Sequence, residues 1–240
     1  MSAPRETVAE TGSTNDDMRE RAQAGAPEGA WLRADRQTRG RGRMQRPWIE
    51  ASGNLYASTL VRLRPGDPAP HTLALVAAVA LAEVAAAYVG ADRVQLKWPN
   101  DLLLDRGGRF VKAAGILLER ADDAVVAGFG VNLAAAPSLA DREAAGLADL
   151  TGAVIAPDLF LDELADGFAR WLAVWRGQGL DPVRERWLRG AHPIGTPLAT
   201  RAGDGAVIDG LFEGLDRDGA LLLRTAERVR TITAGDVFLI

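Results

Sequence analysis

The sequence predicts an α+β protein, in which a mixed, mostly antiparallel sheet with helices is followed by a small β-barrel. Strand-like segments follow one another between residues 94 and 133, and two of them flank the glycine turn DRGGR, which is typical of an antiparallel hairpin. After residue 190 the chain changes to short apolar runs separated by Gly and Asp turns, a pattern typical of a small antiparallel barrel. We therefore expect two domains, residues 1–189 and residues 190–240.

The N-terminal part is expected to alternate strands and helices. Residues 8–10 and 30–35 are short apolar stretches that predict strands. Ser13 stands three residues before Asp16, as at a helix N-terminus, so a helix is expected from there to Gly25. Residues 54–63 alternate in polarity and predict a strand. Residues 72–89 then predict a helix that stops before Gly90.

The middle of the chain is expected to form the rest of the sheet and then to become helical. Residues 94–97 predict a strand that ends in a turn at WPND, and residues 102–104 and 110–119 predict the hairpin around DRGGR. Residues 124–133 predict a further strand. Two helices are expected to follow, at residues 158–176 and 181–188; the first carries apolar residues at three- and four-residue spacings, namely Phe160, Leu164, Phe168, Trp171 and Trp175.

The charge of the chain is concentrated in one place. The formal net charge is −4, yet residues 36–46 carry +5 and no acid, so the remainder carries −9. A protein that holds duplex DNA spreads positive charge over a face, so a local basic segment on an acidic body favours a small anion. The chain has no cysteine, which excludes disulfides, thiolate metal sites and cysteine nucleophiles, and two separated histidines disfavour a histidine-rich metal site.

One segment, residues 72–91, is apolar enough to consider as a membrane span. Nearly half of it is alanine, and Glu83 near its middle would cost about 2.5–3.5 kcal/mol at the centre of a bilayer. A buried core helix is therefore expected there. The N-terminal stretch MSAPRETVAE has no apolar region typical of a secretory signal, so a cytoplasmic protein without a membrane partner is expected.

The basic segment combines glycines, arginines and a tryptophan. Glycine lets backbone N–H groups come close to a ligand, and the planar guanidinium suits phosphate or carboxylate oxygens. Trp48 supplies a flat wall for a ring. Two alternatives remain open on these residues alone: a solvated basic loop, and a nucleic-acid patch, which the acidic remainder disfavours.

Three further motifs are each weak alone. Asn100 and Asp101 end the motif LKWPND, which a simple Pro-Asn turn also explains. Lys112 opens the apolar run KAAGILLE, where its ammonium requires an anion or solvent; its side chain can also reach solvent from a strand end. The motif GFGVN places two glycines and Asn132 at the end of a strand, without the full spacing of a dinucleotide fingerprint.

Taken together, the motifs are specific. The chain carries, in order, GSTND, Gln37 before GRGRxxRxW, SGNLY, KWPND, KxxGILxE and GxGxN. This set closely resembles the biotin–protein ligases over about Gly12 to Leu133, and the barrel-like tail fits the SH3-like domain of that family. The resemblance implies a ligase that activates biotin with ATP as biotinyl-5′-AMP, releases pyrophosphate, and transfers biotin to one lysine of a biotin carboxyl carrier protein, by family that of an acyl-CoA carboxylase.

The resemblance also implies roles for individual residues. It assigns Arg43, Lys112 and Asp101 to catalysis, with Asp101 as a candidate ligand of Mg²⁺. Its assignments to biotin are Ser13, Thr14, Asn15, Gln37, Gly40, Arg41, Gly42, Arg43, Lys112 and Gly115. Its assignments to ATP or the adenylate are Arg41, Arg43, Arg46, Trp48, Asn100, Lys112 and Asn132. Residues 40–46 are expected to close over the adenylate and to protect it from water.

The sequence also departs from the family in two ways. Gln45 stands where many relatives have glycine, which bears on the flexibility of the loop. Some bacterial relatives carry an N-terminal winged helix, whereas here GSTND begins at Gly12, so no sequence-specific DNA binding is expected. Either a monomer or a homodimer is compatible with the sequence.

Three other functions compete with this one. A lipoate or octanoate ligase or transferase shares the broader fold, but such proteins have a triple-glycine loop or a cysteine nucleophile, and this chain has neither. A nucleic-acid-binding protein that uses residues 36–46 and the barrel predicts steeply salt-dependent binding, and it gives Trp48, KWPND and Lys112 no role. A catalytically inactive regulatory relative is disfavoured because the key positions are intact.

Overall fold

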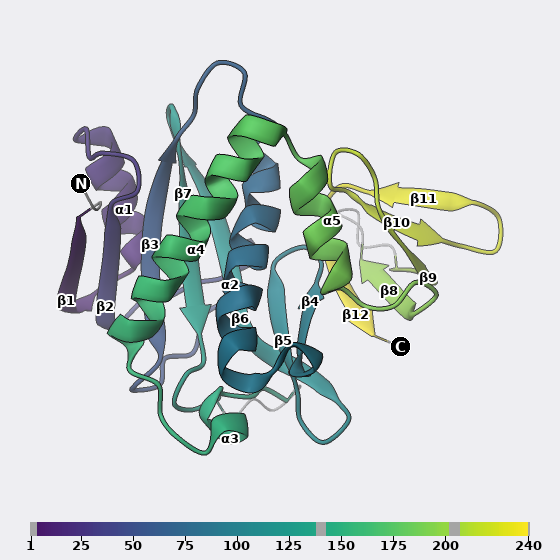
Figure 1. Ribbon diagram of the computed structural model, residues 1–240, viewed down its shortest axis with the longest axis horizontal. Helices are drawn as coiled ribbons and strands as arrows, with labels where there is room; N and C mark the ends of the chain where they lie inside the picture. The colour runs from purple at the N-terminus through teal and green to yellow at the C-terminus, as the bar shows by residue number, and fades with distance from the viewer. Residues whose placement is uncertain (1–3, 138–142, 202–206, 240) are drawn as a thin grey trace.

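The computed structural model describes residues 4–137, 143–201 and 207–239, and its main feature is a seven-stranded sheet (Figure 1). The strand order is β1-β2-β3-β7-β6-β5-β4; β1 and β2 are parallel, and every other neighbouring pair is antiparallel. The strands are β1 (Arg5–Thr11), β2 (Trp31–Gln37), β3 (Leu55–Arg62), β4 (Val94–Lys97), β5 (Asp101–Asp105), β6 (Phe110–Ala121) and β7 (Ala124–Val131). The predicted mixed, mostly antiparallel sheet with helices is confirmed.

Helices cover both faces of this sheet. They are α1 (Thr14–Gln23), α2 (Leu73–Val89), α3 (Ala148–Thr151), α4 (Pro157–Gln178) and α5 (Asp181–Arg189), with short 3₁₀ turns η1 (Arg43–Gln45), η2 (Pro70–Thr72) and η3 (Ala91–Arg93). Figure 1 shows α2 and α4 side by side across one face. Helix α1 packs against β2, β3, β6 and β7.

Side-chain alternation along β3 separates the two faces. Ala57 and Val61 belong to the large cluster that includes α2 and α4, whereas Leu60 belongs to a smaller cluster with Met18 of α1. Because successive strand residues point to opposite faces, Ser58 lies on the same side as Leu60. Helix α1 therefore covers part of this second face, and the remaining part, over β6 and β7, is left for a pocket.

The apolar segment at residues 72–91, which has the composition of a membrane span, forms the core helix α2. Among the described residues, Pro70–Val89 is the one stretch long and apolar enough to cross a bilayer, and 67% of its most apolar window is buried inside the protein. Its single charge is paired internally. Glu83 accepts hydrogen bonds from Trp171 Nε1 and from Arg186 Nε, both at 2.9 Å.

A second sheet follows α5. Strands β8 (Pro197–Arg201), β9 (Val207–Leu215), β10 (Leu221–Arg224), β11 (Val229–Ile232) and β12 (Asp236–Leu239) pair antiparallel in the order β11-β10-β9-β8-β12. Trp98 joins the two sheets, since its Nε1 donates to Gly219 O at 3.1 Å. The expected domain boundary at residue 190 falls in a stretch that still pairs with β4, where Leu96 N donates to Gly190 O at 2.6 Å. The boundary therefore stays a prediction.

Most expected elements are present, with shifted ends. Strand β1 extends beyond the predicted residues 8–10 at both ends. Its N-terminal part was missed because Arg5 and Glu6 are charged and exposed, so no apolar pattern marks a strand there. The four-residue helix α3 was not predicted; it ends at Gly152, whose φ of 70° is readily adopted by glycine.

Candidate active site

The pocket lies between α1, strands β6 and β7, β12, and the arginine loop, which we define as residues 38–48. It brings together residues that are far apart in the sequence. Of the predicted site residues, all except Gly40 line it: Ser13, Thr14, Asn15, Gln37, Arg41, Gly42, Arg43, Arg46, Trp48, Asn100, Asp101, Lys112, Gly115 and Asn132. Gly40 does not line the pocket; its carbonyl accepts the backbone N–H of Trp48 at 2.9 Å within the arginine loop.

One end of the pocket is polar and uncharged. Thr14 donates to Gln37 Oε1 from both its backbone N (2.7 Å) and its Oγ1 (3.0 Å). Because these bonds engage the carbonyl of Gln37, its NH₂ group is the part that can face a ligand. Ser13 occupies the N-cap position of α1, yet its side chain makes no capping bond, so the simple capping role considered from the sequence is not seen.

The middle of the pocket has a floor of glycine. Gly115 of β6 and Gly130 of β7 are cross-strand partners, and the indole of Trp48 lies on them. A Cβ atom added at Gly130 would lie 2.7 Å from Trp48 Cε2, and one at Gly115 would lie 3.0 Å from Cζ3. The reason for the glycines of GFGVN was missed in the sequence, although the motif itself was the signal. Trp48 Nε1 is buried without a partner among the described residues.

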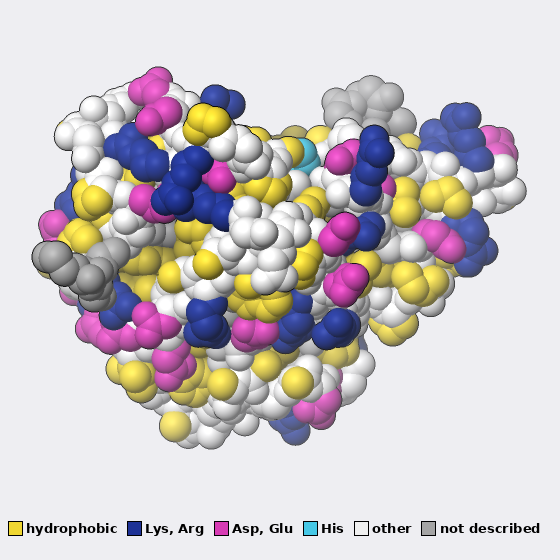
Figure 2. Space-filling model, turned by 45° about the horizontal axis from the view of Figure 1, so that its top comes forward, with side chains coloured by type: hydrophobic (Ala, Val, Ile, Leu, Met, Phe, Trp, Pro, Cys, Tyr) yellow, Lys and Arg dark blue, Asp and Glu magenta, His cyan; other side chains and the backbone are white. Residues whose placement is uncertain are grey.

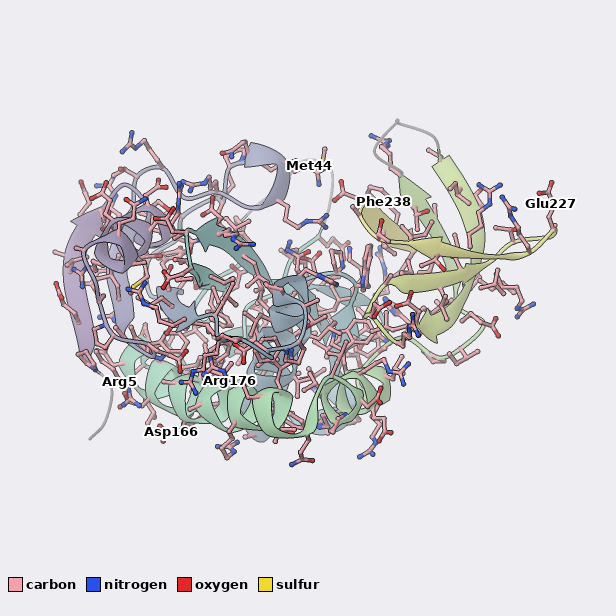
Figure 3. The ribbon with its side chains drawn as sticks, turned by 90° about the horizontal axis from the view of Figure 1, so that it is seen from above. Arg5, Met44, Asp166, Arg176, Glu227 and Phe238 are labelled. Carbon is pink, nitrogen blue, oxygen red and sulfur yellow. The ribbon has the colours of Figure 1, made fainter. Side chains whose placement is uncertain are left out.

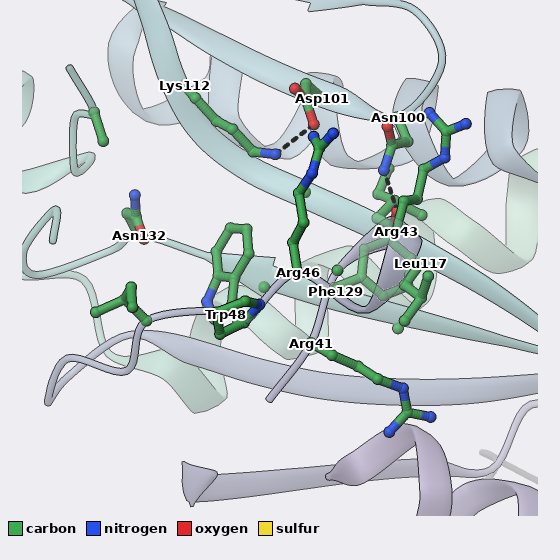
Figure 4. A pocket seen from close by; sticks show the side chains of 18 of the residues that line it. Arg41, Arg43, Arg46, Trp48, Asn100, Asp101, Lys112, Leu117, Phe129 and Asn132 are labelled. Carbon is green, nitrogen blue, oxygen red and sulfur yellow. Dashed lines mark hydrogen bonds and ion pairs between the residues drawn. The ribbon is translucent and has the colours of Figure 1, made fainter. Parts of the chain in front are cut away.

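Two lysines contact the carboxylate of Asp101, and Figure 4 shows one of them, Lys112, pointing toward it. Lys112 Nζ lies 2.6 Å from Asp101 Oδ1, and Lys97 Nζ lies 3.3 Å from Asp101 Oδ2. Burial opposes ionisation of Asp101, but the two ammonium groups outweigh burial and hold the pKa of this carboxyl below its usual value. Lys97 had no assigned role, although it stands in the predicted KWPND motif. Lys112 Nζ also lies 5.5 Å from the centre of the Trp48 ring.

The three arginines assigned to the ligand make separate contacts within the protein. Arg41 forms a bidentate pair with Asp16 at 2.6 and 2.7 Å and also binds Glu119 at 2.9 Å. These bonds, to Asp16 first, raise its pKa above the ordinary value, and Figure 4 shows Arg41 pointing away from Trp48 and Lys112. Direct contact between Arg41 and a ligand stays a prediction, and it would require these bonds to open.

The other two arginines contact the C-terminal sheet. Arg43 donates to Gly235 O at 3.0 Å, and Arg46 forms an ion pair with Asp236 at the start of β12. Figure 3 shows this region from above, with Met44 labelled in the loop and Phe238 in β12. The contact between residues near 45 and near 236 was not predicted, because nothing in the local sequence pairs them.

The arginine loop folds back on itself as a tight turn. Gly42 N donates to Arg46 O at 2.8 Å, and Met44 and Gln45 both have left-handed backbones, with φ of 56° and 58°. Such a conformation costs a residue other than glycine roughly 1–2 kcal/mol. A glycine at position 45 would adopt this backbone at a lower cost than Gln45 does.

Two asparagines complete the pocket. Asn100 donates from Nδ2 to Ile116 O at 2.5 Å, which ties the KWPND turn to β6. Asn132 donates from Nδ2 to Ala145 O at 3.2 Å, whereas its Oδ1 is buried and has no partner among the described residues. A free buried acceptor beside an aromatic ring suits the amino group of a heterocycle.

The described residues do not form a ready-made metal site. In the parts of the chain that the structure describes, no group of three or more His, Cys, Asp and Glu side chains is placed to hold a metal ion. Both oxygens of Asp101 are occupied by ammonium groups. Figure 2 shows Lys and Arg side chains interspersed with Asp and Glu on the face that it draws, rather than a continuous basic surface.

Comparison with known proteins gives consistent matches. Residues 9–133 match the biotin/lipoate A/B protein ligase family, and residues 199–240 match the biotin protein ligase C-terminal domain. The chain is 39% identical over 242 residues to a biotin–[acetyl-CoA-carboxylase] ligase of Paracoccus denitrificans, covering 96% of this chain and 98% of the relative. It is 35% identical to the enzyme of that name from Mycobacterium tuberculosis, covering 97% and 87% respectively. The solved biotin protein ligase of Aquifex aeolicus in complex with biotin and ATP shares the fold, with a TM-score of 0.86, 24% identity and 99% coverage of both chains.

Proposed function

Because the chain belongs to the biotin protein ligase family, we propose that it is an ATP-dependent ligase that biotinylates a carboxyl carrier protein. It joins biotin to ATP, releases pyrophosphate, and passes the biotinyl group from biotinyl-5′-AMP to a lysine of the carrier subunit of an acetyl-CoA carboxylase. The observation that carries this proposal is the pocket itself, which brings together an uncharged polar end, an aromatic ring on a glycine floor, and a pair of lysines beside that floor.

The polar end suits the ureido ring of biotin. A urea is uncharged and presents both a carbonyl acceptor and N–H donors, so it needs neutral groups of both kinds. The amide NH₂ of Gln37 is available to donate, and the hydroxyl oxygens of Ser13 and Thr14 are available to accept. All three residues line the pocket, and the two at the start of α1 are 3% exposed.

The aromatic end suits adenine. Trp48 offers a stacking surface, and a base stacked on an aromatic side chain gains about 1–3 kcal/mol. The unpartnered Asn132 Oδ1 accepts a hydrogen bond from the exocyclic amino group. The two residues were assigned to this role through the family resemblance, and their placement in one pocket supports it.

The charged residues beside the glycine floor support the chemical step. A carboxylate oxygen of biotin attacks the α-phosphorus of ATP, a new P–O bond forms, and the bond to the β-phosphate breaks as pyrophosphate leaves. Two anions must approach each other, so fixed positive charge lowers the barrier. Lys112 and Lys97 already lie there with Asp101, and Arg43 reaches this region from the loop. No covalent bond to the enzyme is needed, in keeping with the absence of cysteine.

Mg²⁺ is proposed as part of the nucleotide substrate. The donor set around Asp101 does not fit a metal held by protein groups alone, because Lys97 and Lys112 occupy both carboxylate oxygens. Mg²⁺ bound to ATP takes most of its ligands from phosphates and water. Asp101 is able to contribute one oxygen only after a lysine turns from it toward a phosphate.

The second step uses the same pocket. The amine of the acceptor lysine attacks the biotinyl carbonyl, the amide bond forms, and AMP leaves. Before transfer, the adenylate must be protected from water, and we propose that the arginine loop supplies this cover. Protease protection of residues 40–46 by biotin plus ATP is the corresponding test; cleavage that is unchanged by the ligands would count against the cover.

We propose further that the protein acts in the cytoplasm, as a monomer or homodimer, without sequence-specific DNA binding. The proposal of no DNA binding rests on the acidic balance of the chain outside residues 36–46, which carries a formal charge of −9. A fluorescence titration with operator DNA that showed tight, sequence-selective binding would overturn it.

The proposed function is tested by biotin-dependent ATP–pyrophosphate exchange, followed by transfer of labelled biotin to a carrier domain. Exchange and transfer are both expected with biotin. Lipoate is the matched control substrate, because the matched family includes lipoate ligases. Exchange with lipoate and none with biotin would refute the proposal.

A further inference from the structure

A continuous chain of polar side chains joins the arginine loop to the proposed biotin end of the pocket. Arg41 binds Glu119 of β6, and Asn15 Nδ2 donates to the same carboxylate at 2.8 Å. On its other side, Asn15 Oδ1 accepts from Ser58 Oγ at 2.7 Å, and Ser58 Oγ lies 2.7 Å from Thr14 Oγ1. Asn15, Ser58 and Thr14 are almost wholly buried, so these bonds face no competition from solvent.

The directions of the hydrogen bonds from Glu119 as far as Ser58 follow from the charge of Glu119. A carboxylate that binds a guanidinium only accepts, so the NH₂ group of Asn15 must face it. Asn15 Oδ1 then faces Ser58, and an amide oxygen also only accepts. Ser58 has a single hydroxyl proton and must donate it there, so it has none left for Thr14 Oγ1, whose own proton goes to Gln37 Oε1. The lone pairs of Thr14 are therefore not used by Ser58 and stay available to accept from a ligand in the pocket.

We propose that Glu119 is a positioning residue for biotin: it fixes the Asn15 amide and, through Ser58, presents Thr14 as a hydrogen-bond acceptor to the N–H groups of the ureido ring. This inference rests on the proposed ligase function and deepens it. Glu119 does not itself line the pocket among the described residues, whereas Thr14 and Asn15 do.

The same carboxylate also links biotin recognition to the arginine loop. Arg41 lies between two carboxylates, Asp16 of α1 and Glu119 of β6, so the start of the loop is held to both elements. The backbone leaves room for this arrangement at Gly128 of β7, where an added Cβ would lie only 2.0 Å from Asn15 Oδ1. A shift of the loop that moves Arg41 therefore also perturbs Asn15, because both side chains bind the carboxylate of Glu119.

The test is Glu119→Gln, with biotin binding measured by isothermal titration in the absence of ATP. A glutamine keeps the shape but can donate, so the Asn15 amide is free to turn over. Loss of a hydrogen-bond arrangement that involves a charged group predicts a biotin Kd raised about tenfold or more. Absence of binding to the wild-type protein would instead contradict the proposed function, so the two failures are distinguishable.

Glu83→Gln is the matched control. Glu83 also accepts one neutral N–H and one guanidinium, from Trp171 and Arg186, and its side chain is similarly exposed (29% against 19% for Glu119), yet it lies outside the pocket. Its substitution is expected to lower the melting temperature without changing the biotin Kd. Equal changes in Kd for the two variants would show that only general stability matters, and would overturn the proposal.

A double-mutant cycle covers the possibility that Glu119→Gln simply weakens the fold. Ser58→Ala interrupts the chain of hydrogen bonds at its middle. The side chain of Ser58 bonds Asn15 and Thr14, and the substitution leaves Glu119 itself unchanged. If one chain of bonds carries the effect, either substitution breaks it, and the double variant is expected to bind biotin about as weakly as the weaker single variant. Effects that multiply fully would show two independent sites and refute the inference.

Discussion

His192 is expected to make the stability of the protein depend on pH in a way that its surroundings determine. The residue lies between α5 and β8 and is 6% exposed, and its Nε2 has no hydrogen-bond partner among the described residues. Burial, and to a smaller degree the charge of Lys97, lowers the pKa of His192 to about 4, against an ordinary value of 6.5.

The sign and size of the effect follow from proton binding. Below pH 6.5 the unfolded chain takes up a proton at His192 that the folded protein accepts only near pH 4, so acid favours unfolding. The stabilisation is fully present above pH 6.5 and is lost as the pH falls toward 4. At pH 5, protonation of His192 favours the unfolded over the folded state by a factor of about 30, whereas at pH 7 the factor is close to 1. The free energy of unfolding is therefore expected to fall by about 2 kcal/mol between pH 7 and pH 5.

The assay is urea unfolding at pH 7 and pH 5, followed by tryptophan fluorescence. The control is His192→Asn, which carries no titratable group at this position and should show little change over the same interval. Carboxyl groups with lowered pKa, such as Asp101 and Glu28, act mainly below this window. A pH dependence as steep in His192→Asn as in the wild-type protein would refute the reasoning.

Three further predictions concern the pocket and its loop. Lys112→Ala and Arg43→Ala are expected to slow ATP–pyrophosphate exchange by about a hundredfold while the circular dichroism spectrum stays unchanged; unfolded variants or near-normal exchange would contradict this. Gly130→Ala places a methyl group about where the Trp48 indole lies, so the KM for ATP should rise more than that for biotin, and an equal rise would argue against the stacking role. Gln45→Gly relieves a left-handed backbone and should raise the unfolding free energy in urea by up to about 1 kcal/mol, whereas a loss would show that the glutamine side chain contributes more.

Much of the fold was readable because its signals are local. The apolar run at residues 72–89 predicted a core helix, and the structure has α2 at Leu73–Val89. The hairpin around DRGGR also follows from neighbouring residues. The parallel pairing of β1 with β2 was not predicted. The two strands are separated in the chain by α1, and neither strand sequence contains a signal that identifies its partner.

The same distinction applies to the site. The site residues were gathered from the sequence through the resemblance of six ordered motifs to one family, and the structure brings all of them except Gly40 to the lining of one pocket. What each side chain binds depends on partners from elsewhere: Asp16 and Glu119 for Arg41, and Asp236 for Arg46. Lys97 was overlooked because its relation to Asp101 depends on the shape of the turn between β4 and β5.

The ion pair between Arg46 and Asp236 changes how ionic strength should act on the ligase. An arginine that already has an internal counter-ion does not recruit one from the solvent, so a phosphate that replaces Asp236 exchanges one anion for another. Few bound salt ions are then released on nucleotide binding. Because released ions are what make polyanion binding strongly salt-dependent, affinity for ATP at this loop should vary only weakly with salt.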